Sequence, residues 1–172
     1  MYLVCAGCVV RDWRQDDAPA LARHADNRRI WANLRDRFPS PYTLEDAESW
    51  VRHAARALPA TDFCIGVDGA AAGAIGLVLR DDVDRVSAEL GFWLGEPFWG
   101  RGIMSDAVAA FVPWAFDRFG LSRIYAQVFA FNPASARVLE KAGFALEATL
   151  RRSAVKQDVI TDQWQFARIR ER

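Results

Sequence analysis

The amino-acid sequence contains only three cysteines and two histidines, and it has no excess of charge of either sign. A small, odd number of cysteines argues against a disulfide framework. Acidic and basic residues number 22 each, so no net field attracts nucleic acid or an anionic membrane surface. We therefore expect neither partner, and a charged substrate would have to be met by local charge.

Long apolar runs are also lacking. No stretch approaches the roughly 20 apolar residues of a transmembrane helix, and the N-terminus lacks the basic region and length of a signal peptide. These absences predict a cytoplasmic protein. Repeats, low-complexity segments and linkers are lacking too, and 172 residues with 52% hydrophobic content predict one domain, residues 1–172, with a substantial core.

The pair Cys5 and Cys8 has the spacing of a metal or redox motif. A zinc site needs a second pair of ligands, however, and only Cys64, His24 and His53 remain, at no recognisable spacing. We therefore expect no metal and interpret the pair as part of a mobile N-terminal segment that leads into the first strand.

Three motifs of nucleotide-binding and hydrolytic enzymes are absent. Gly100 and Gly102 lack the third glycine of a dinucleotide fingerprint, and no Gly-Lys-Ser/Thr phosphate loop or Gly-x-Ser-x-Gly elbow occurs. The sequence therefore carries no motif of a dinucleotide-binding protein, a P-loop nucleotide-binding protein or a serine hydrolase of this type.

Strands and helices are expected to alternate along the chain. Asp16 or Asp17 is expected to cap the first helix, Thr43 the third, and Asp68-Gly69 is a strong hairpin signal. We expect strands over residues 9–13, 63–67, 71–79, 86–94, 123–129, 144–152 and 160–168. We expect a first helix that ends near residue 25 and further helices over residues 28–35, 44–58, 102–119 and 132–142.

The pattern places one helix between the strands 86–94 and 123–129, which makes a βαβ unit. Those two strands should therefore be parallel, within a sheet that is otherwise mainly antiparallel. The predicted fold class is α/β, in a mixed α+β arrangement.

The segment from Trp99 to Ser105, called the glycine loop below, joins the strand 86–94 to the following helix. It carries Gly100, Arg101 and Gly102 at the junction. Unpaired N–H groups in the first turn of a helix and the positive end of its dipole favour an anion, and glycine lets a ligand approach the backbone closely. This junction predicts a phosphate site.

The glycine loop occurs with two further motifs, Asn132-Pro133-Ala134-Ser135 and Glu140-Lys141-Ala142-Gly143-Phe144. Together they resemble the GNAT acyl-CoA-dependent N-acetyltransferases, in the Rim-type branch that acetylates the N-termini of ribosomal proteins. The resemblance covers nearly the whole chain. It implies the GNAT fold, a mainly antiparallel mixed sheet of about seven strands flanked by helices, and acetyl-CoA as acyl donor without a metal.

The resemblance also implies which residues bind acetyl-CoA. The glycine loop holds the pyrophosphate, Asn132 contacts the pantetheine arm, and Lys141 points toward the phosphates; a helix cap and a solvated helix face are the respective alternatives. The N–H groups of Phe92 to Leu94 would stabilise the carbonyl oxygen if a bulge or splay frees them. The implied set is Phe92, Trp93, Leu94, Trp99, Gly100, Arg101, Gly102, Ile103, Met104, Ser105, Asn132 and Lys141. Met104 replaces a small residue of the family and could narrow the cradle.

Glu89 is the candidate general base. It is the one ionisable residue in the run 86–94, and the family often places a carboxylate on this strand. A solvated or structurally paired strand glutamate is the alternative. Deprotonating a lysine at pH 7 costs roughly 3 kcal/mol more than deprotonating an α-amino group, so a single carboxylate suits an N-terminus better.

Ser135 is the candidate acid that protonates the departing thiolate. The resemblance puts a serine with this role at the matching position, one turn inside the helix that Asn132 caps and Pro133 begins. Equally, Ser135 could only reinforce the cap. Tyr125 is the second candidate, because many other family members use a nearby tyrosine.

Trp31, Phe38, Pro41 and Tyr42 match a segment that folds over the substrate in the family, and Trp31, Phe38 and Tyr42 are the candidate substrate contacts. The nearby Arg28, Arg29 and Arg35 could meet an acidic peptide or carboxylates. Residues 28–42, which contain all of these, are called the acceptor segment below. A helix that packs its aromatic residues and solvates its arginines is the plainer alternative.

These observations predict an N-acetyltransferase that moves an acetyl group from acetyl-CoA to a primary amine, by direct attack in a ternary complex. The α-amino group of a protein or peptide N-terminus is the favoured acceptor. The alternatives are a small amine (a polyamine, an aminoglycoside or an amino-acid conjugate) and a non-catalytic acyl-CoA-binding module. The oligomeric state stays open, with a homodimer among the candidates.

Overall fold

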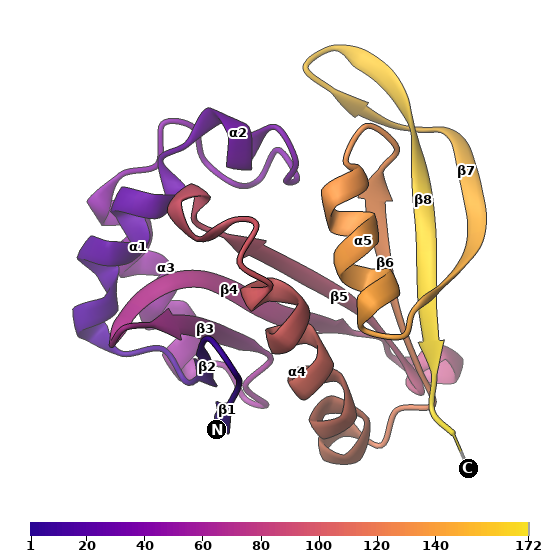
Figure 1. The fold of residues 1–172 in the computed structure, drawn as a ribbon, viewed down its shortest axis with the longest axis horizontal. Coiled ribbons are helices and arrows are strands. Elements are labelled where there is room, and N and C mark those ends of the chain that lie inside the picture. The colour runs from indigo at the N-terminus through magenta and orange to yellow at the C-terminus, as the bar shows by residue number, and fades with distance from the viewer. Residues whose placement is uncertain (172) are drawn as a thin grey trace. The chain divides into compact units, whose positions relative to one another are not determined.

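The computed structural model describes residues 1–171, which form two compact units (Figure 1). Unit 1 contains Met1–Gly76 and Phe92–Ala107, and unit 2 contains Leu77–Gly91 and the chain from Val108 onward. The strands make one sheet in the order β1-β2-β3-β4-β5-β6-β8-β7. The predicted mixed, mainly antiparallel sheet with flanking helices is thereby confirmed.

The antiparallel strands of unit 1 begin at the N-terminus. β1 (Tyr2–Val4) pairs with β2 (Val9–Arg11), which pairs with β3 (Asp62–Val67), and β3 pairs with β4 (Ala70–Leu79). The expectation of a mobile N-terminal segment was therefore wrong. Three residue pairs between β1 and β2 make it an eighth strand, one more than the seven expected.

The turn between β3 and β4 is the hairpin expected from Asp68-Gly69. Both residues have positive φ, 49° and 84°, and Val67 pairs with Ala70 across the turn. Two consecutive positive φ angles are typical of a type I′ turn, whose twist matches that of the strands, and aspartate followed by glycine adopts it readily. The prediction of this hairpin is confirmed.

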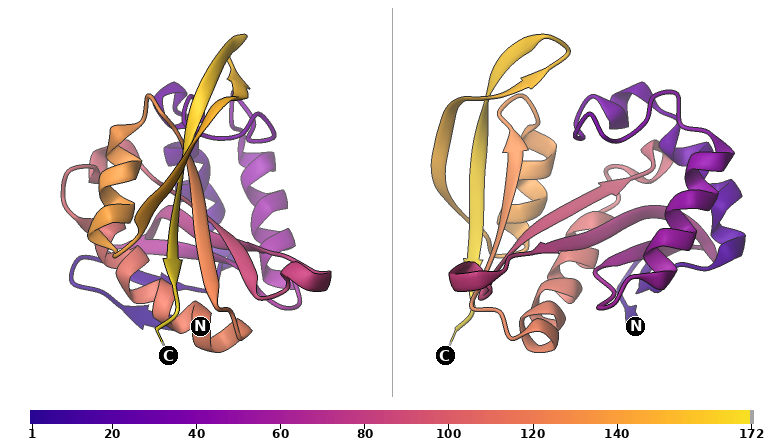
Figure 2. Two further views of the ribbon diagram at one scale, coloured as in Figure 1. Left: turned by 90° about the vertical axis from the view of Figure 1, so that its right-hand side faces the viewer. Right: turned by 180° about the vertical axis from the view of Figure 1, so that it is seen from behind.

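Three helices belong to unit 1: α1 (Ala18–Ala25), α2 (Arg28–Trp31) and α3 (Leu44–Arg56). α1 and α3 lie side by side (Figure 2) and pack against Cys64 of β3 and Ala71 of β4. The cap of α3 is as predicted, because Thr43 Oγ1 accepts from the N–H of Asp46 at 3.2 Å.

Two expectations about these helices were wrong. Asp17 precedes α1, but its carboxylate does not cap that helix; it accepts two hydrogen bonds of 2.7 Å from the buried Arg11 guanidinium. α2 ends at Trp31, four residues before the expected end at Arg35. Capping preferences of adjacent residues could not show that the buried Arg11 guanidinium needs the Asp17 carboxylate as its partner.

Unit 2 contains the parallel strand pair. β5 (Ser87–Leu94), of which the residues to Gly91 lie in this unit, pairs with β6 (Arg123–Phe129) from Ser87–Arg123 to Glu89–Tyr125, in parallel as predicted. β6 then pairs antiparallel with β8 (Val159–Ile169) as far as Phe129–Gln163.

The outer strand of unit 2 is β7 (Ala145–Lys156), which forms a long twisted hairpin with β8 (Figure 2). Both strands are longer than the expected 144–152 and 160–168. The turn at Gln157 and Asp158 again has two positive φ angles, 50° and 60°.

Two further helices complete the chain. α4 (Ile103–Phe119) begins in unit 1 and continues into unit 2, and Gly120 follows it with a φ of 63°. α5 (Pro133–Lys141) lies in unit 2. Within residues 1–171, no helix combines the length and apolar character needed to cross a membrane.

Candidate active site

The glycine loop is an open corner of unit 1. Gly100 and Gly102 have φ angles of 74° and 78°, a conformation that side chains with a Cβ rarely adopt. A Cβ built on either residue would meet no atom within 4 Å. The glycines are therefore required by the backbone conformation, and the space beside them is free for a ligand.

The first turn of α4 follows the loop directly. The N–H of Asp106 donates to the carbonyl of Gly102 at 3.0 Å, so the amides of residues 103–105 precede the first helical hydrogen bond. Met104 is 7% exposed and lies among the core residues. The methionine that could have narrowed the cradle is therefore buried, while the Arg101 side chain is exposed.

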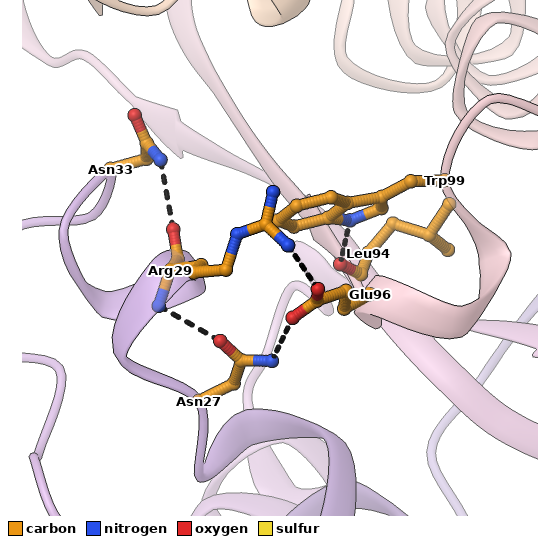
Figure 3. Close-up of polar contacts among 6 residues, drawn as sticks. All are labelled: Asn27, Arg29, Asn33, Leu94, Glu96 and Trp99. Atoms are coloured by element: carbon orange, nitrogen blue, oxygen red, sulfur yellow. Dashed lines mark hydrogen bonds and ion pairs between the residues drawn. The ribbon is translucent and has the colours of Figure 1, made fainter.

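Trp99, the first residue of the loop, is held by the end of β5 (Figure 3). Its indole Nε1–H donates to the carbonyl of Leu94 at 2.7 Å, and the Arg29 guanidinium lies 5.1 Å from the ring centroid. The indole N–H is therefore engaged within the protein, so any role of this residue toward a cofactor would involve its backbone or ring.

The end of β5 approaches β4 closely. A Cβ on Gly73 would lie 2.3 Å from the carbonyl oxygen of Trp93, and the N–H of Gly95 donates to Ala72 at 2.7 Å. Glycine at position 73 therefore sets the spacing of the two backbones at Phe92–Leu94, the stretch predicted to supply oxyanion donors.

The aromatic residues of the acceptor segment gather at the same strand end. The ring centroid of Phe38 lies 4.8 Å from that of Tyr42 and 5.8 Å from that of Trp93. Tyr42 is buried, and burial raises the pKa of its hydroxyl to about 12. Trp31 precedes this cluster in the sequence. The centroid of its ring lies 4.8 Å from Cζ of the Arg28 guanidinium.

Sequence reasoning missed Glu96, which follows β5. Its carboxylate accepts from Asn27 Nδ2 at 2.7 Å and pairs with Arg29 (Figure 3). The hydrogen bond from Asn27 lowers the pKa of the Glu96 carboxyl, and Arg29 adds to the effect. Arg29, one of the arginines expected to meet an acidic substrate, is thus already paired within the protein.

In unit 2, Glu89 lies beside a cation and a phenol. Its side chain is 12% exposed, and its carboxylate lies 3.7 Å from the Arg80 guanidinium. Arg80 Nε also donates to the Tyr125 hydroxyl at 2.9 Å, and Tyr125 is the residue opposite Glu89 in the parallel pair. The structure therefore brings the candidate base and the second candidate acid together through a residue that sequence analysis did not identify.

A second arginine faces the same ring. Arg123 lies 5.7 Å from the centroid of Tyr125 and donates to Glu147 at 2.6 Å. This hydrogen bond lowers the pKa of the Glu147 carboxyl. The order of the strands could have pointed to Arg80 in the sequence. β4 and β5 follow one another along the chain, so the residue after β4 lies near the start of β5, where the Arg80 N–H donates to the Ser87 carbonyl.

Ser135 forms the cap of α5 with Asn132. Its N–H donates to Asn132 Oδ1 at 3.2 Å, and Asn132 Nδ2 donates to Ser135 Oγ at 2.9 Å. The Ser135 hydroxyl accepts here and keeps its own hydrogen for another partner. Lys141 is exposed in the last turn of the same helix, at the end opposite Ser135.

The cysteine pair forms the turn between β1 and β2. Cys8 is buried, its Sγ lies 3.8 Å from the carbonyl of Ile103, and burial raises the pKa of its thiol to about 12. All three cysteines are free. Residues 1–171 contain no cluster of three or more His, Cys, Asp or Glu side chains that could hold a metal ion.

Comparison with known proteins identifies the family. The model of the acetyltransferase (GNAT) domain matches residues 8–145. The ribosomal-protein-serine acetyltransferase of Escherichia coli (strain K12) is 34% identical over 97 residues, which are 55% of this chain and 54% of that protein. The chain spans only 36%, 37% and 45% of the lengths of three N-acetyltransferases from Bacillus subtilis (strain 168).

Solved structures share the fold. The ribosomal-protein-S5-alanine acetyltransferase from Vibrio fischeri has a TM-score of 0.85 at 19% identity, covering 98% of this chain and 96% of that one. RimL, a ribosomal L7/L12 α-N-protein acetyltransferase solved with coenzyme A, has a TM-score of 0.84 at 21% identity, covering 98% of both chains. Because the family model spans most of the sequence, the chain belongs to the GNAT acetyltransferase domain family.

Proposed function

We propose that the protein is an N-acetyltransferase that moves the acetyl group of acetyl-CoA to a primary amine, with the α-amino group of a peptide or protein N-terminus as the favoured acceptor. The observation that carries this proposal is the open glycine loop at the start of α4. Its glycines have positive φ and open space beside them, and the amides of residues 103–105 precede the first helical hydrogen bond. A helix N-terminus of this kind favours a phosphate group.

The residues of the loop fit the diphosphate of coenzyme A. The backbone amides of Ile103, Met104 and Ser105 would hold it together with the exposed Arg101. Acetyl-CoA supplies the thioester, whose carbonyl carbon accepts the amine and whose thiolate departs. Membership of the GNAT family and the coenzyme A bound to RimL support this assignment.

Glu89 is the proposed proton acceptor for the attacking amine, directly or through water. A carboxylate with only 12% of its side chain exposed is shielded from bulk solvent, and the Arg80 guanidinium 3.7 Å away restrains its orientation. General bases of this kind contribute roughly 10²–10⁴-fold to the rate.

Two hydroxyl groups remain candidates for protonating the thiolate. Ser135 accepts from Asn132, and Tyr125 accepts from Arg80, so each keeps one O–H to donate. The Ser135 hydroxyl also belongs to the cap of α5, and replacing it therefore affects the helix as well as any proton transfer.

The acceptor is proposed to meet Trp31, Phe38 and Tyr42. The names of the E. coli and V. fischeri relatives, which act on ribosomal proteins, support a protein N-terminus. The cost of deprotonating the acceptor agrees, because the pKa of an α-amino group lies about 2.5 units below that of lysine.

Release of free thiol from acetyl-CoA tests the proposal. The purified protein is offered peptides with a free α-amine, the same peptides with a blocked N-terminus but a lysine, and small amines such as polyamines and aminoglycosides. We expect release with the free α-amine only. Release with small amines alone would replace the acceptor, and coenzyme A binding without any release would indicate a non-catalytic module.

Replacing Glu89 by glutamine tests its role as base. At pH values below the acceptor pKa, which is near 8 for an α-amine, we expect kcat/KM to fall about 10²-fold or more. At higher pH it should fall less, because the free amine already predominates. Glu147→Gln removes a paired carboxylate of the same unit and serves as the control. A pH–rate profile of Glu89→Gln that matches the control would remove Glu89 from the mechanism.

A further inference from the structure

Three side chains connect the acceptor segment to the turn before the glycine loop (Figure 3). Asn27 Oδ1 accepts from the N–H of Arg29 at 2.8 Å and so caps α2, while Asn27 Nδ2 donates to Glu96 at 2.7 Å. Arg29 pairs with the other carboxylate oxygen of Glu96. The amide of Asn27 is thus used at both ends, and its orientation is set by these two partners.

Glu96 also takes part in the turn that leads into the loop. Its carbonyl accepts from the N–H of Trp99 at 3.1 Å, while its carboxylate holds α2. The Trp99 ring lies 5.1 Å from the Arg29 guanidinium, and its N–H donates to Leu94. Glu96 therefore connects α2 with the glycine loop, and Trp99 connects that loop with the end of β5.

This network is too exposed to serve mainly as a stabiliser of the fold. The Arg29 side chain is 69% exposed and that of Glu96 is 35% exposed. Exposed ion pairs contribute little to stability because water screens them and ordering the side chains costs entropy. Their geometry can nevertheless orient short segments, and α2 has only four residues of its own.

We propose that Glu96 is a positioning residue that couples the glycine loop to the acceptor segment, so that coenzyme A bound at the loop orders α2 through Asn27 and Arg29. This inference rests on the proposed function, because it requires coenzyme A at the glycine loop. An ordered α2 then presents Trp31 to the acceptor.

The test measures hydrogen exchange of the amides of Ile30, Trp31 and Ala32, which form the hydrogen bonds of α2, with and without coenzyme A. In the wild type we expect coenzyme A to slow exchange about two- to fivefold, the range that coupling through an exposed charged pair supports. Asn27→Asp keeps an acceptor for the cap but places a carboxylate against Glu96, so the slowing should disappear.

The double variant Asn27→Asp/Glu96→Gln reverses the direction of the hydrogen bond. The glutamine amide can donate to the new aspartate, which still caps α2, so we expect the slowing by coenzyme A to return. Glu48→Gln is the control, because it removes a surface ion pair of α3 with Arg52 and should leave the slowing unchanged.

Activity gives a second readout. In Asn27→Asp the KM for the acceptor should rise about two- to fivefold while the Kd for coenzyme A stays within a factor of two, and the double variant should restore KM. Binding of coenzyme A without slower exchange in α2, or a double variant that behaves like Asn27→Asp, would overturn this inference alone. Failure of the wild type to bind coenzyme A would overturn the proposed function as well.

Discussion

Replacing Gly73 by alanine should separate the two strands that frame the predicted oxyanion stretch. The new Cβ would lie 2.3 Å from the carbonyl oxygen of Trp93 and 3.0 Å from the Cα of Leu94. Both are backbone atoms that cannot rotate away. Because ordinary contacts of a Cβ begin at 3.4 Å, the backbones must separate by about 1 Å.

The cost follows from the contacts at this point. Overpacking of this kind costs about 1–3 kcal/mol, and losing the hydrogen bond from Gly95 to Ala72 costs about 1 kcal/mol more. Alanine returns about 0.4–1 kcal/mol by restricting the unfolded chain. The net expectation is a loss of about 1–3 kcal/mol of unfolding free energy.

Urea unfolding measures this loss, with Gly91→Ala as the matched control. Gly91 also belongs to β5, has no atom within 4 Å of a built Cβ and does not have positive φ, so its replacement should be neutral or slightly stabilising. With m of about 2 kcal/mol/M, a loss of 2 kcal/mol lowers the urea midpoint by about 1 M.

Catalysis provides the second measurement on the same two variants. A displacement of about 1 Å at Phe92–Leu94 should lower kcat by about tenfold or more at a temperature where Gly73→Ala is folded, because transition-state contacts tolerate little misplacement. If Gly73→Ala were as stable and as active as Gly91→Ala, the assigned spacing of β4 and β5 would be incorrect.

Three further outcomes are expected. Asp17→Asn should lose about 3–5 kcal/mol in denaturant unfolding, because it leaves the buried Arg11 guanidinium without a charged partner; a loss below 1 kcal/mol would contradict this. Thr43→Ala should cost about 1 kcal/mol at pH 7. Hydrogen bonds from the Thr43 backbone N–H, and secondly from its hydroxyl, lower the pKa of the Asp46 carboxyl, and alanine removes only the hydroxyl bond. The part of the loss that comes from this bond is complete above the unfolded pKa near 4 and disappears as pH falls through the folded value, so thermal melts of the variant and the wild type should move closer in acid, while the loss of the cap on the Asp46 N–H persists. Gly102→Ala should fold with a cost of about 1–2 kcal/mol but bind coenzyme A at least about tenfold more weakly by calorimetry, and unchanged affinity would argue against the loop as the diphosphate site.

Local signals in the sequence predicted much of the fold. The hairpin at Asp68-Gly69, the cap at Thr43, the boundaries of β6 and the parallel pairing of β5 with β6 are all confirmed. Each depends on residues close in sequence or on the single helix that connects β5 to β6, so the information lies within one contiguous stretch of the chain.

The candidate site could be predicted less completely. The glycine loop was identifiable, because its glycines and the helix after it are contiguous, but the roles of Glu89 and Ser135 remain predictions. Arg80 and Glu96 were missed because their significance lies in partners far along the chain, Tyr125 in one case and Asn27 with Arg29 in the other.

The sequence by itself determined where the chain turns, that Thr43 caps α3 and Asn132 caps α5, and where the open glycine loop forms, since those features follow from backbone preferences of a few adjacent residues. Only the tertiary structure decided which carboxylates pair with arginines and which strand pairs with the outer edge of β2. Asp17 pairs with Arg11 because a buried guanidinium needs a charged partner, and Tyr2–Val4 pairs with β2 because an unpaired strand edge leaves backbone hydrogen-bonding groups without partners. Glu96 pairs with Arg29 at the surface, where the fold brings two segments together that are far apart in the sequence.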